Sequence, residues 1–287
     1  MKNYLELTTT EKQALVAFLN ESRENKATPE EWEKQLASEV YGYGRGILIK
    51  LDKEQVLGKV SVVLKECGSK GMAYVIDLEV SPDSKVKEAL ARALLDAAKN
   101  VAVEHKAREV YLGADKKEIL DILEKLHFKK QYEAQKMILE DRTPREAPLE
   151  LLPLSEENKG EYLGLYNAAF REAPNGSTLG AEDVEEYLRQ ADENRSYYIV
   201  IDKNQKLGFL EFDLKSDRGK FDLGLLKEFR GQGYGKRLLE TAIDYLNQKE
   251  AEEASLLVIT KNEIAYSLYK ARGFKIDKVI SQWFVLR

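Results

Sequence analysis

"FRGQGYGKRLL", from Phe229 to Leu239, places three glycines within five residues just before a helix-like pattern. The residues ahead of it, Leu223–Leu226, are apolar and strand-like, so this glycine loop joins a strand to the start of a helix. The first N–H groups of a helix have no internal partner, and its dipole places about half a positive charge there. Gly231, Gly233 and Gly235 leave the backbone open to a large anion. The stretch therefore predicts a phosphate or pyrophosphate site, with Arg230, Lys236 and Arg237 adding positive charge.

Two common phosphate motifs do not fit this loop. A P-loop would need Gly at position 230 and Ser or Thr at position 237, and both are Arg. A dinucleotide fingerprint starting at Gly231 would need Gly at position 236, which is Lys. A tight turn without a ligand is the simpler alternative, but three glycines exceed what such a turn requires, since each costs ~0.5–1 kcal/mol of chain entropy.

The chain contains an internal duplication. "DKEQVLGKVSVVL" begins at Asp52 and "DKNQKLGFLEFDL" at Asp202, while "LEKLHF" from Leu123 matches "YKARGF" from Tyr269. The order and the near-constant offset indicate two copies of one unit. We expect domains at residues 1–144 and 145–287, joined by the proline-containing linker Asp141–Glu150.

Both copies show the same succession of patterns, which predicts an α/β (α+β) fold with two tandem domains, each a mixed, mainly antiparallel sheet flanked by helices. Each copy opens with two helices, for which Thr28 and Ser155 are the expected N-caps. Strands are expected at residues 46–51, 59–64, 197–201 and 207–214, with a third strand ending at 80 in one copy and 226 in the other. A helix, a strand, a helix and a final β segment then close each copy.

Composition narrows the class of protein. The formal net charge is -5 and basic residues alternate with acidic ones, which argues against nucleic-acid binding. The chain has one cysteine and two histidines, which argues against a disulfide framework, a His-based triad and a metal site, so we expect no metal. No long apolar segment is present, which predicts no membrane partner and a cytoplasmic location. The oligomeric state stays open.

The glycine loop resembles the acyl-CoA site of the GNAT acetyltransferases, whose hallmark is Arg/Gln-x-x-Gly-x-Gly/Ala. Arg230, Gly233 and Gly235 fit this hallmark, whereas Lys227 replaces the proline usual before it. A second hallmark of the family, an Asn, an Ala and a Tyr ahead of Gly-Phe, is matched at the positions Asn262, Ala265, Tyr269, Gly273 and Phe274. The resemblance covers residues 151–287 well and the first half only in pattern.

The resemblance implies an N-acetyltransferase that moves an acetyl group from acetyl-CoA, its acyl-donor substrate, to an amine of a small molecule or peptide by direct attack. It implies that Leu225 and Leu226 offer backbone groups to the pantetheine arm, and that Asn262 hydrogen-bonds the donor. It also implies that the pyrophosphate is wrapped by the loop residues Arg230, Gly231, Gln232, Gly233, Tyr234, Gly235 and Lys236. Tyr269 is then the candidate general acid for the leaving thiolate.

The general base is not fixed by the motifs. Glu211 lies on an otherwise apolar strand, and Asp222 lies just before the end of the next one, so both are candidates. Solvated strand positions are an equally good interpretation of either carboxylate.

The first copy lacks the features of the site. Its residues 85–90, "KVKEAL", replace the loop glycines, and Leu123 and His127 stand where the second copy has Tyr269 and Gly273. We therefore expect a degenerate first copy and one donor site per chain. The alternatives are a non-catalytic acyl-CoA-binding or regulatory module, and a purely structural tandem domain.

Overall fold

The computed structural model describes residues 1–21, 23–82, 86–215 and 218–286. They form two compact units: unit 1 is Met1–Tyr132 with Ser281–Arg287, and unit 2 is Glu133–Ile280. No helix among the described residues has the length and apolar character needed to cross a bilayer.

Unit 1 begins with a short strand and two helices and continues as a sheet. Its elements are β1 (Lys2–Asn3), α1 (Thr9–Asn20), α2 (Pro29–Leu36), β2 (Ile47–Asp52), β3 (Gln55–Val63), α3 (Lys65–Lys70), β4 (Met72–Val80), α4 (Lys87–Glu104), β5 (Glu109–Ala114) and α5 (Lys117–Lys125), with 3₁₀ turns at Tyr4–Glu6 and Glu39–Tyr41. The expected cap of α2 is confirmed, because the Thr28 side chain accepts from the Glu31 N–H and Pro29 opens the helix.

Apart from α3, unit 2 repeats this order in its described residues. Its elements are β7 (Glu150–Pro153), α6 (Lys159–Phe170), α7 (Ala181–Gln190), β8 (Arg195–Asp202), β9 (Gln205–Lys215), β10 (Arg218–Leu225), a 3₁₀ turn at Lys227–Phe229, α8 (Tyr234–Gln248), β11 (Glu253–Ile259) and α9 (Glu263–Arg272). The expected cap of α6 is wrong: the helix starts four residues after Ser155, and Asn158 is its N-cap. The Asn158 Oδ1 instead accepts from the Ser155 N–H at 2.8 Å and closes a turn ahead of the helix.

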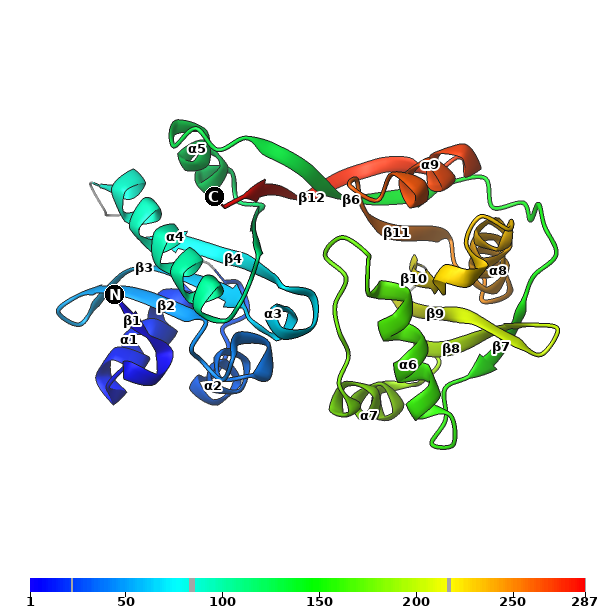
Figure 1. Ribbon diagram of the computed structural model, residues 1–287, viewed down its shortest axis with the longest axis horizontal. Helices are drawn as coiled ribbons and strands as arrows, with labels where there is room; N and C mark the ends of the chain where they lie inside the picture. Colours follow the sequence, from blue (N-terminus) through cyan, green and yellow to red (C-terminus); the bar gives the residue numbers. More distant parts are fainter. Residues whose placement is uncertain (22, 83–85, 216–217, 287) are drawn as a thin grey trace. The chain divides into compact units, whose positions relative to one another are not determined.

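Helices cover both faces of each sheet. In unit 2, α6 and α7 pack on one face through Tyr162, Val184 and Phe209, and α8 and α9 pack on the other through Leu239, Phe221 and Phe274 (Figure 1). In unit 1, α4 and α5 share one apolar cluster with β3 and β4, and α1 and α2 share another with β2. The α/β fold class expected from the patterns is therefore confirmed.

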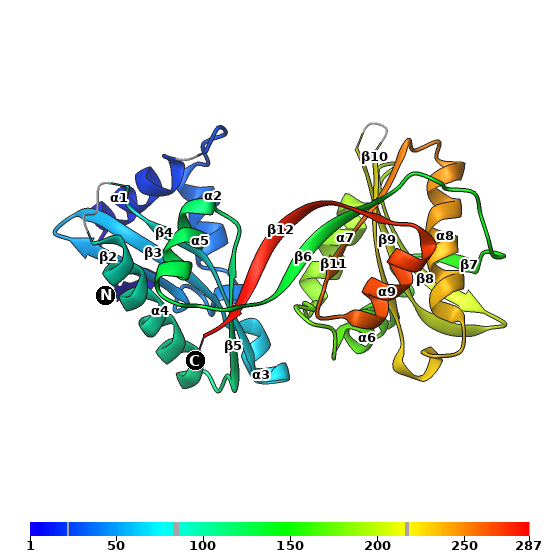
Figure 2. The same cartoon turned by 90° about the horizontal axis from the view of Figure 1, so that it is seen from above.

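Each half of the chain gives its last strand to the other unit. The strand β6 (Lys130–Leu139) pairs antiparallel with β11 of unit 2, from Leu139↔Ala254 to Ala134↔Ile259. The end of β12 (Lys275–Val285) pairs with β5 of unit 1, from Gln282↔Ala114 to Val285↔Tyr111 (Figure 2). The chain therefore passes between the units after residues 132 and 280, whereas the sequence pattern suggested one passage near residue 144.

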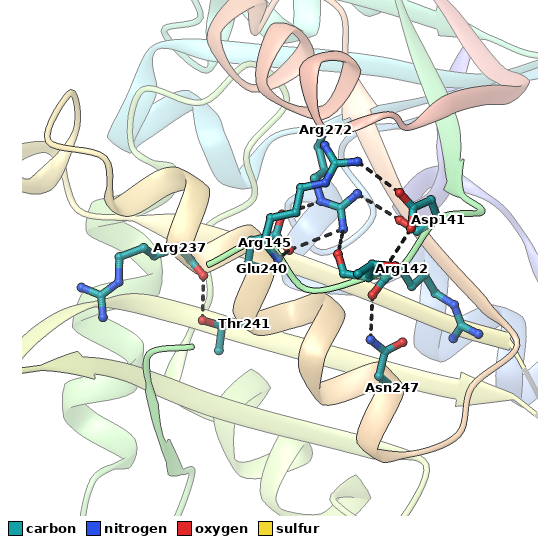
Figure 3. A network of polar contacts seen from close by, with 9 residues as sticks. Asp141, Arg142, Arg145, Arg237, Glu240, Thr241, Asn247 and Arg272 are labelled. Atoms are coloured by element: carbon teal, nitrogen blue, oxygen red, sulfur yellow. Dashed lines mark hydrogen bonds and ion pairs between the residues drawn. The ribbon is translucent and has the colours of Figure 1, made fainter. Parts of the chain in front are cut away.

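The segment expected as a linker, Asp141–Glu150, is hydrogen-bonded to α8 and α9 inside unit 2. Arg272 is buried, and its guanidinium pairs with the buried Glu240 and donates to the carbonyls of Asp141 (3.0 Å) and Thr143 (2.9 Å). The Arg145 N–H donates to Glu240 Oε2 at 3.2 Å (Figure 3). Because a buried charge needs a partner, this ion pair fixes the path of the chain between β6 and β7.

Candidate functional site

The sheet of unit 2 opens between β10 and β11. The strand β10 pairs with β9 along its whole length, from Arg218 to Leu225, but pairs in parallel with β11 only at Arg218–Lys220. Past Lys220 the two strands diverge, and a cavity of about 240 Å³ lies at the opening. Its lining includes Asp222, Leu223, Leu257, Asn262 and Tyr269. The pattern of the strands alone did not reveal this opening.

The glycine loop stands at the end of β10 and leads into α8. Gly231 and Gly233 have φ angles of 77° and 88°, in the left-handed region that favours glycine. A Cβ at either position would meet none of the described atoms within 4 Å. No side chain caps α8, whose N-cap is Gly233, and in the described chain the N–H groups of residues 232–235 donate to no protein acceptor. The loop thus presents open backbone donors at a helix N-terminus.

Arg230 holds this loop in place. Its Nε donates to the Leu225 carbonyl at 3.1 Å and its guanidinium to the Ala169 carbonyl at 2.9 Å. Glu172 lies 3.6 Å from the same guanidinium and also pairs with Lys227. The side chain of Arg230 therefore ties the end of β10 to the end of α6.

The basic residues of α8 differ in what they contact. Arg237 pairs with Asp202 at 3.3 Å, and the Tyr234 hydroxyl donates to the same carboxylate at 3.2 Å. The Arg237 guanidinium lowers the pKa of Asp202. Lys236 is exposed and has no ion-pair partner in the described part of the chain. Of these two cations, Lys236 is the one available to an anion at the helix start.

Tyr269 and Asn262 come to the cavity from α9. Tyr269 is only 6% exposed, and its ring centroid lies 5.9 Å from that of Phe274. Burial, and secondly the charge of Asp222, raises its pKa well above the ordinary value. Asn262 is the N-cap of α9, with its Oδ1 accepting from the Ala265 N–H at 3.3 Å. The tyrosine is thus held as a neutral phenol that can donate.

The two candidate carboxylates lie side by side. Asp222 on β10 is the register partner of Glu211 on β9, and both point to the face covered by α6 and α7. Glu211 lines a second cavity of about 220 Å³, and Asp222 lines both cavities. Burial raises the pKa of Glu211 to about 8, with the charge of Asp222 adding to the effect. Asp222 is accessible from the cavities, but the surrounding protein removes part of its solvation, and this raises its pKa to about 6.

Three tyrosines surround this carboxylate pair. The Tyr162 hydroxyl donates to Glu211 Oε1 at 2.5 Å, and Tyr187 stacks on Tyr197 with centroids 4.3 Å apart. Burial raises the pKa of Tyr162, and Glu211 adds to this. No motif in the sequence pointed to this polar role of Tyr162. The available signal was a tyrosine stripe on a helix opposite an acidic strand position.

The comparisons with known proteins agree with this geometry. Residues 161–274, which contain the opening, the loop and α9, match the model of the Acetyltransferase (GNAT) family. The chain contains a GNAT domain.

Similarity to individual proteins extends over both halves. The mycothiol acetyltransferase of Acidimicrobium ferrooxidans is 26% identical over 250 residues, which are 81% of this chain and 79% of that protein. A GCN5-related N-acetyltransferase from Sphaerobacter thermophilus superposes with a TM-score of 0.57 at 16% identity, over 98% of this chain and 94% of that one. A tandem GNAT protein from the clavulanic acid biosynthesis pathway gives a TM-score of 0.50 at 14% identity, over 96% and 93%. The two structural matches concern the fold alone, and they support two tandem GNAT-like domains.

The first GNAT-like copy has a different loop and helix start. Lys85, expected opposite Arg230, lies outside the described residues, and α4 begins at Lys87 with Glu88 in its first turn. Glu88 pairs with Lys125 at 2.8 Å. Leu123 is fully buried at the position of Tyr269, and His127, at the position of Gly273, takes a left-handed φ of 61°. The copy thus keeps the helix-ending turn but has lost the glycines and the phenol.

Proposed function

We propose that the chain is an acetyl-CoA-dependent N-acetyltransferase whose site is the opening between β10 and β11 in unit 2. The observation that carries this proposal is the conjunction of open backbone donors at residues 232–235 with a cavity that joins Tyr269 and Asp222. The membership of this half in the GNAT family supports the reaction class.

The residues present suit the acyl donor. A pyrophosphate would lie against the N–H groups after Gly231, with Lys236 beside it and Arg230 holding the loop from behind. The pantetheine arm would follow the edge of β10 that β11 leaves unpaired, near Leu225 and Leu226. Asn262 would contribute the donor group of its amide, because its Oδ1 is already taken by the cap of α9.

In this reaction the amine nitrogen bonds to the acetyl carbon, the carbon–sulfur bond breaks, and one proton leaves the nitrogen while another reaches the sulfur. A free alkylamine of pKa near ~10 is mostly protonated at pH 7, which costs about 4 kcal/mol, so a base is needed. We assign this role to Asp222, since it borders both cavities and its pKa of about 6 leaves it ionised at neutral pH. Glu211, with a pKa of about 8, is then the protonated neighbour that positions the site.

Tyr269 is the proposed donor to the departing sulfur. Its raised pKa keeps the proton on the phenol at neutral pH, so that a hydrogen bond to the developing thiolate is available. The oxyanion requires a further donor, which we place in a backbone N–H of the unpaired edge of β10; loss of such a donor typically costs ~2.7–4 kcal/mol.

Titration calorimetry with acetyl-CoA and an amine screen test this function. We expect one acetyl-CoA per chain, and release of CoA above the hydrolysis background with at least one amine among small molecules and peptides with free N-termini. Binding without turnover across the whole screen would favour the non-catalytic acyl-CoA-binding module. A stoichiometry near two would show that the first copy also binds the donor.

A further inference from the structure

Unit 1 contains an opening in the same place as the donor site of unit 2. The strand β4 pairs in parallel with β5 only over Met72–Val75, while it continues along β3 up to Val80. A cavity of about 240 Å³ lies where the two strands diverge. All the residues that line this cavity belong to unit 1.

The lining of this cavity is charged. Arg23, Asp77, Glu79, Asp115 and Lys116 all border it. In unit 2 the corresponding cavity has Asp222 as its one charged residue among the described lining residues, and the others are apolar or neutral polar, such as Leu223, Asn262 and Tyr269. An uncharged pantetheine arm fits such walls, whereas five charged side chains favour a ligand that carries charges of its own.

Two of the three carboxylates that line the cavity have lysine partners. Lys59, only 2% exposed, lies 3.6 Å from Asp77 and has its pKa lowered by burial. Lys116 lies 3.5 Å from Glu79. Each of the two β4 carboxylates that line the cavity, Asp77 and Glu79, is therefore paired with a lysine.

One cation and one anion remain. Neither Arg23 nor Asp115 makes an ion pair within the described ranges. The Arg23 guanidinium lies 4.1 Å from the Trp32 ring centroid, so stacking holds its plane while its N–H edge stays available. Such a guanidinium is suited to a carboxylate, and a carboxylate such as Asp115 to an ammonium.

We propose that this cavity binds a free α-amino acid, with its carboxylate on Arg23 and its ammonium on Asp115. A cavity of about 240 Å³ has room for an amino acid. The chain would then contain a ligand-binding domain, unit 1, in addition to the proposed catalytic domain, unit 2, whatever amine the latter acetylates.

The test is a ligand-observed NMR screen of the full chain against the twenty protein amino acids, followed by calorimetric titration of those that bind. We expect at least one to bind with a Kd of about 1 mM or tighter. The amine left by removing its carboxyl group and the acid left by removing its amino group should each bind at least about tenfold more weakly, because each lacks one charged contact. If none of the twenty binds below about 10 mM, the proposal is overturned.

Matched variants locate the site. Asp115→Asn and Arg23→Gln should each weaken binding about tenfold or more, whereas the exposed controls Asp96→Asn and Arg45→Gln should not change it. Circular dichroism checks that each variant is folded. Glu211→Gln, in unit 2, should also leave binding unchanged. An amino acid whose affinity falls with Glu211→Gln and not with Asp115→Asn would be an acceptor in the GNAT site, and the proposal would fail.

Discussion

Asp222 and Glu211 face each other across antiparallel strands, and their carboxyl groups share one side of the sheet. Two carboxyl groups this close do not ionise independently, because the charge of one raises the pKa of the other. Desolvation raises the pKa of Asp222 to about 6, and burial together with the charge of Asp222 raises the pKa of Glu211 to about 8. Separation of this kind gives one ionised base and one neutral neighbour at pH 7.

The pH profile should report this pair. The base must be ionised, so kcat should rise as the pH increases through about 6 and then level off, because Asp222 loses its proton in that range. Asp222→Asn should remove this step and lower kcat by ~10²–10⁴-fold. Glu211→Gln should keep the step near pH 6, since Glu211 is protonated there. Asp213→Asn on the same strand face is the control, and a step near pH 6 that survives Asp222→Asn would remove Asp222 from the role of base.

Gly233→Glu should abolish acetyl-CoA binding while the fold is kept. The new carboxylate would stand at the N-terminus of α8, where the pyrophosphate belongs, so we expect affinity to fall about 100-fold or more. The control is Gly233→Asn, because asparagine tolerates the positive φ of this position and is uncharged. Calorimetry that finds equal affinity in the wild type and Gly233→Glu would refute the placement of the donor.

Lys236 and Arg237 should respond differently to substitution. Lys236→Ala should weaken acetyl-CoA binding about three- to tenfold, because an exposed lysine without a described ion pair is free to meet the pyrophosphate. Arg237→Ala should instead leave binding nearly unchanged and lower the melting temperature by a few degrees, since Asp202 loses its partner. Calorimetry and thermal melts of both variants decide the matter; the reverse ranking of affinities would contradict the assignment.

Tyr269→Phe should lower kcat far more than it changes the KM for acetyl-CoA. The phenol is proposed to donate to the leaving sulfur and not to hold the donor, so the loss should be ~10²-fold or more in kcat. Tyr266→Phe, on the same helix, is the matched control. Should Tyr269→Phe leave kcat unchanged while single-turnover kinetics show chemistry to be rate-limiting, the residue has no part in the mechanism.

Arg272→Met should destabilise unit 2 by about 3–5 kcal/mol, since it leaves the carboxylate of Glu240 buried without its partner. The double variant Arg272→Met with Glu240→Gln should recover part of this loss. Hydrogen exchange of residues 141–149 gives the readout. Both tryptophans, Trp32 and Trp283, belong to unit 1, so their fluorescence reports on unit 1 and serves as an internal reference. Unchanged exchange of residues 141–149 in Arg272→Met would show that the pair does not hold this segment.

Local signals in the sequence predicted most of the elements and the loop. Alternation of apolar residues predicted the end of β4 at Val80, a capping box predicted the cap at Thr28, and the placement of glycines predicted the start of α8 after Gly233. All three signals act within a few residues. Ser155 failed as a cap because the chain first makes a turn over residues 155–158, closed by the Asn158 side chain on the Ser155 N–H, and α6 starts only after it. Three elements were missed: β1 has only two residues, α3 is one turn and a half of mixed composition, and β7 is a short strand with a proline.

The pairing of the last strands could not be predicted in this way. β6 and β12 were expected as terminal β segments, but nothing in an isolated strand states which edge it joins. The opening at Asp222 could not be predicted from local sequence either, because it depends on where β11 stops pairing with β10. Likewise, the Glu211 pKa reflects α6 and α7 packed above the strand, which no property of the strand itself reveals.

The exchange of last strands has a consequence for synthesis. Domains that fold from the N-terminus during translation can normally finish before the ribosome completes the chain. Here the strand that closes against Tyr111 and Ala114 is made only after the whole of Glu133–Ile280, and its partner is separated from it by more than half of the given sequence. Contacts of such long range form slowly, because a large loop must close first. The first unit should therefore remain incomplete during translation, with the open side of β5 as a target for chaperones, until residues 281–287 have been made.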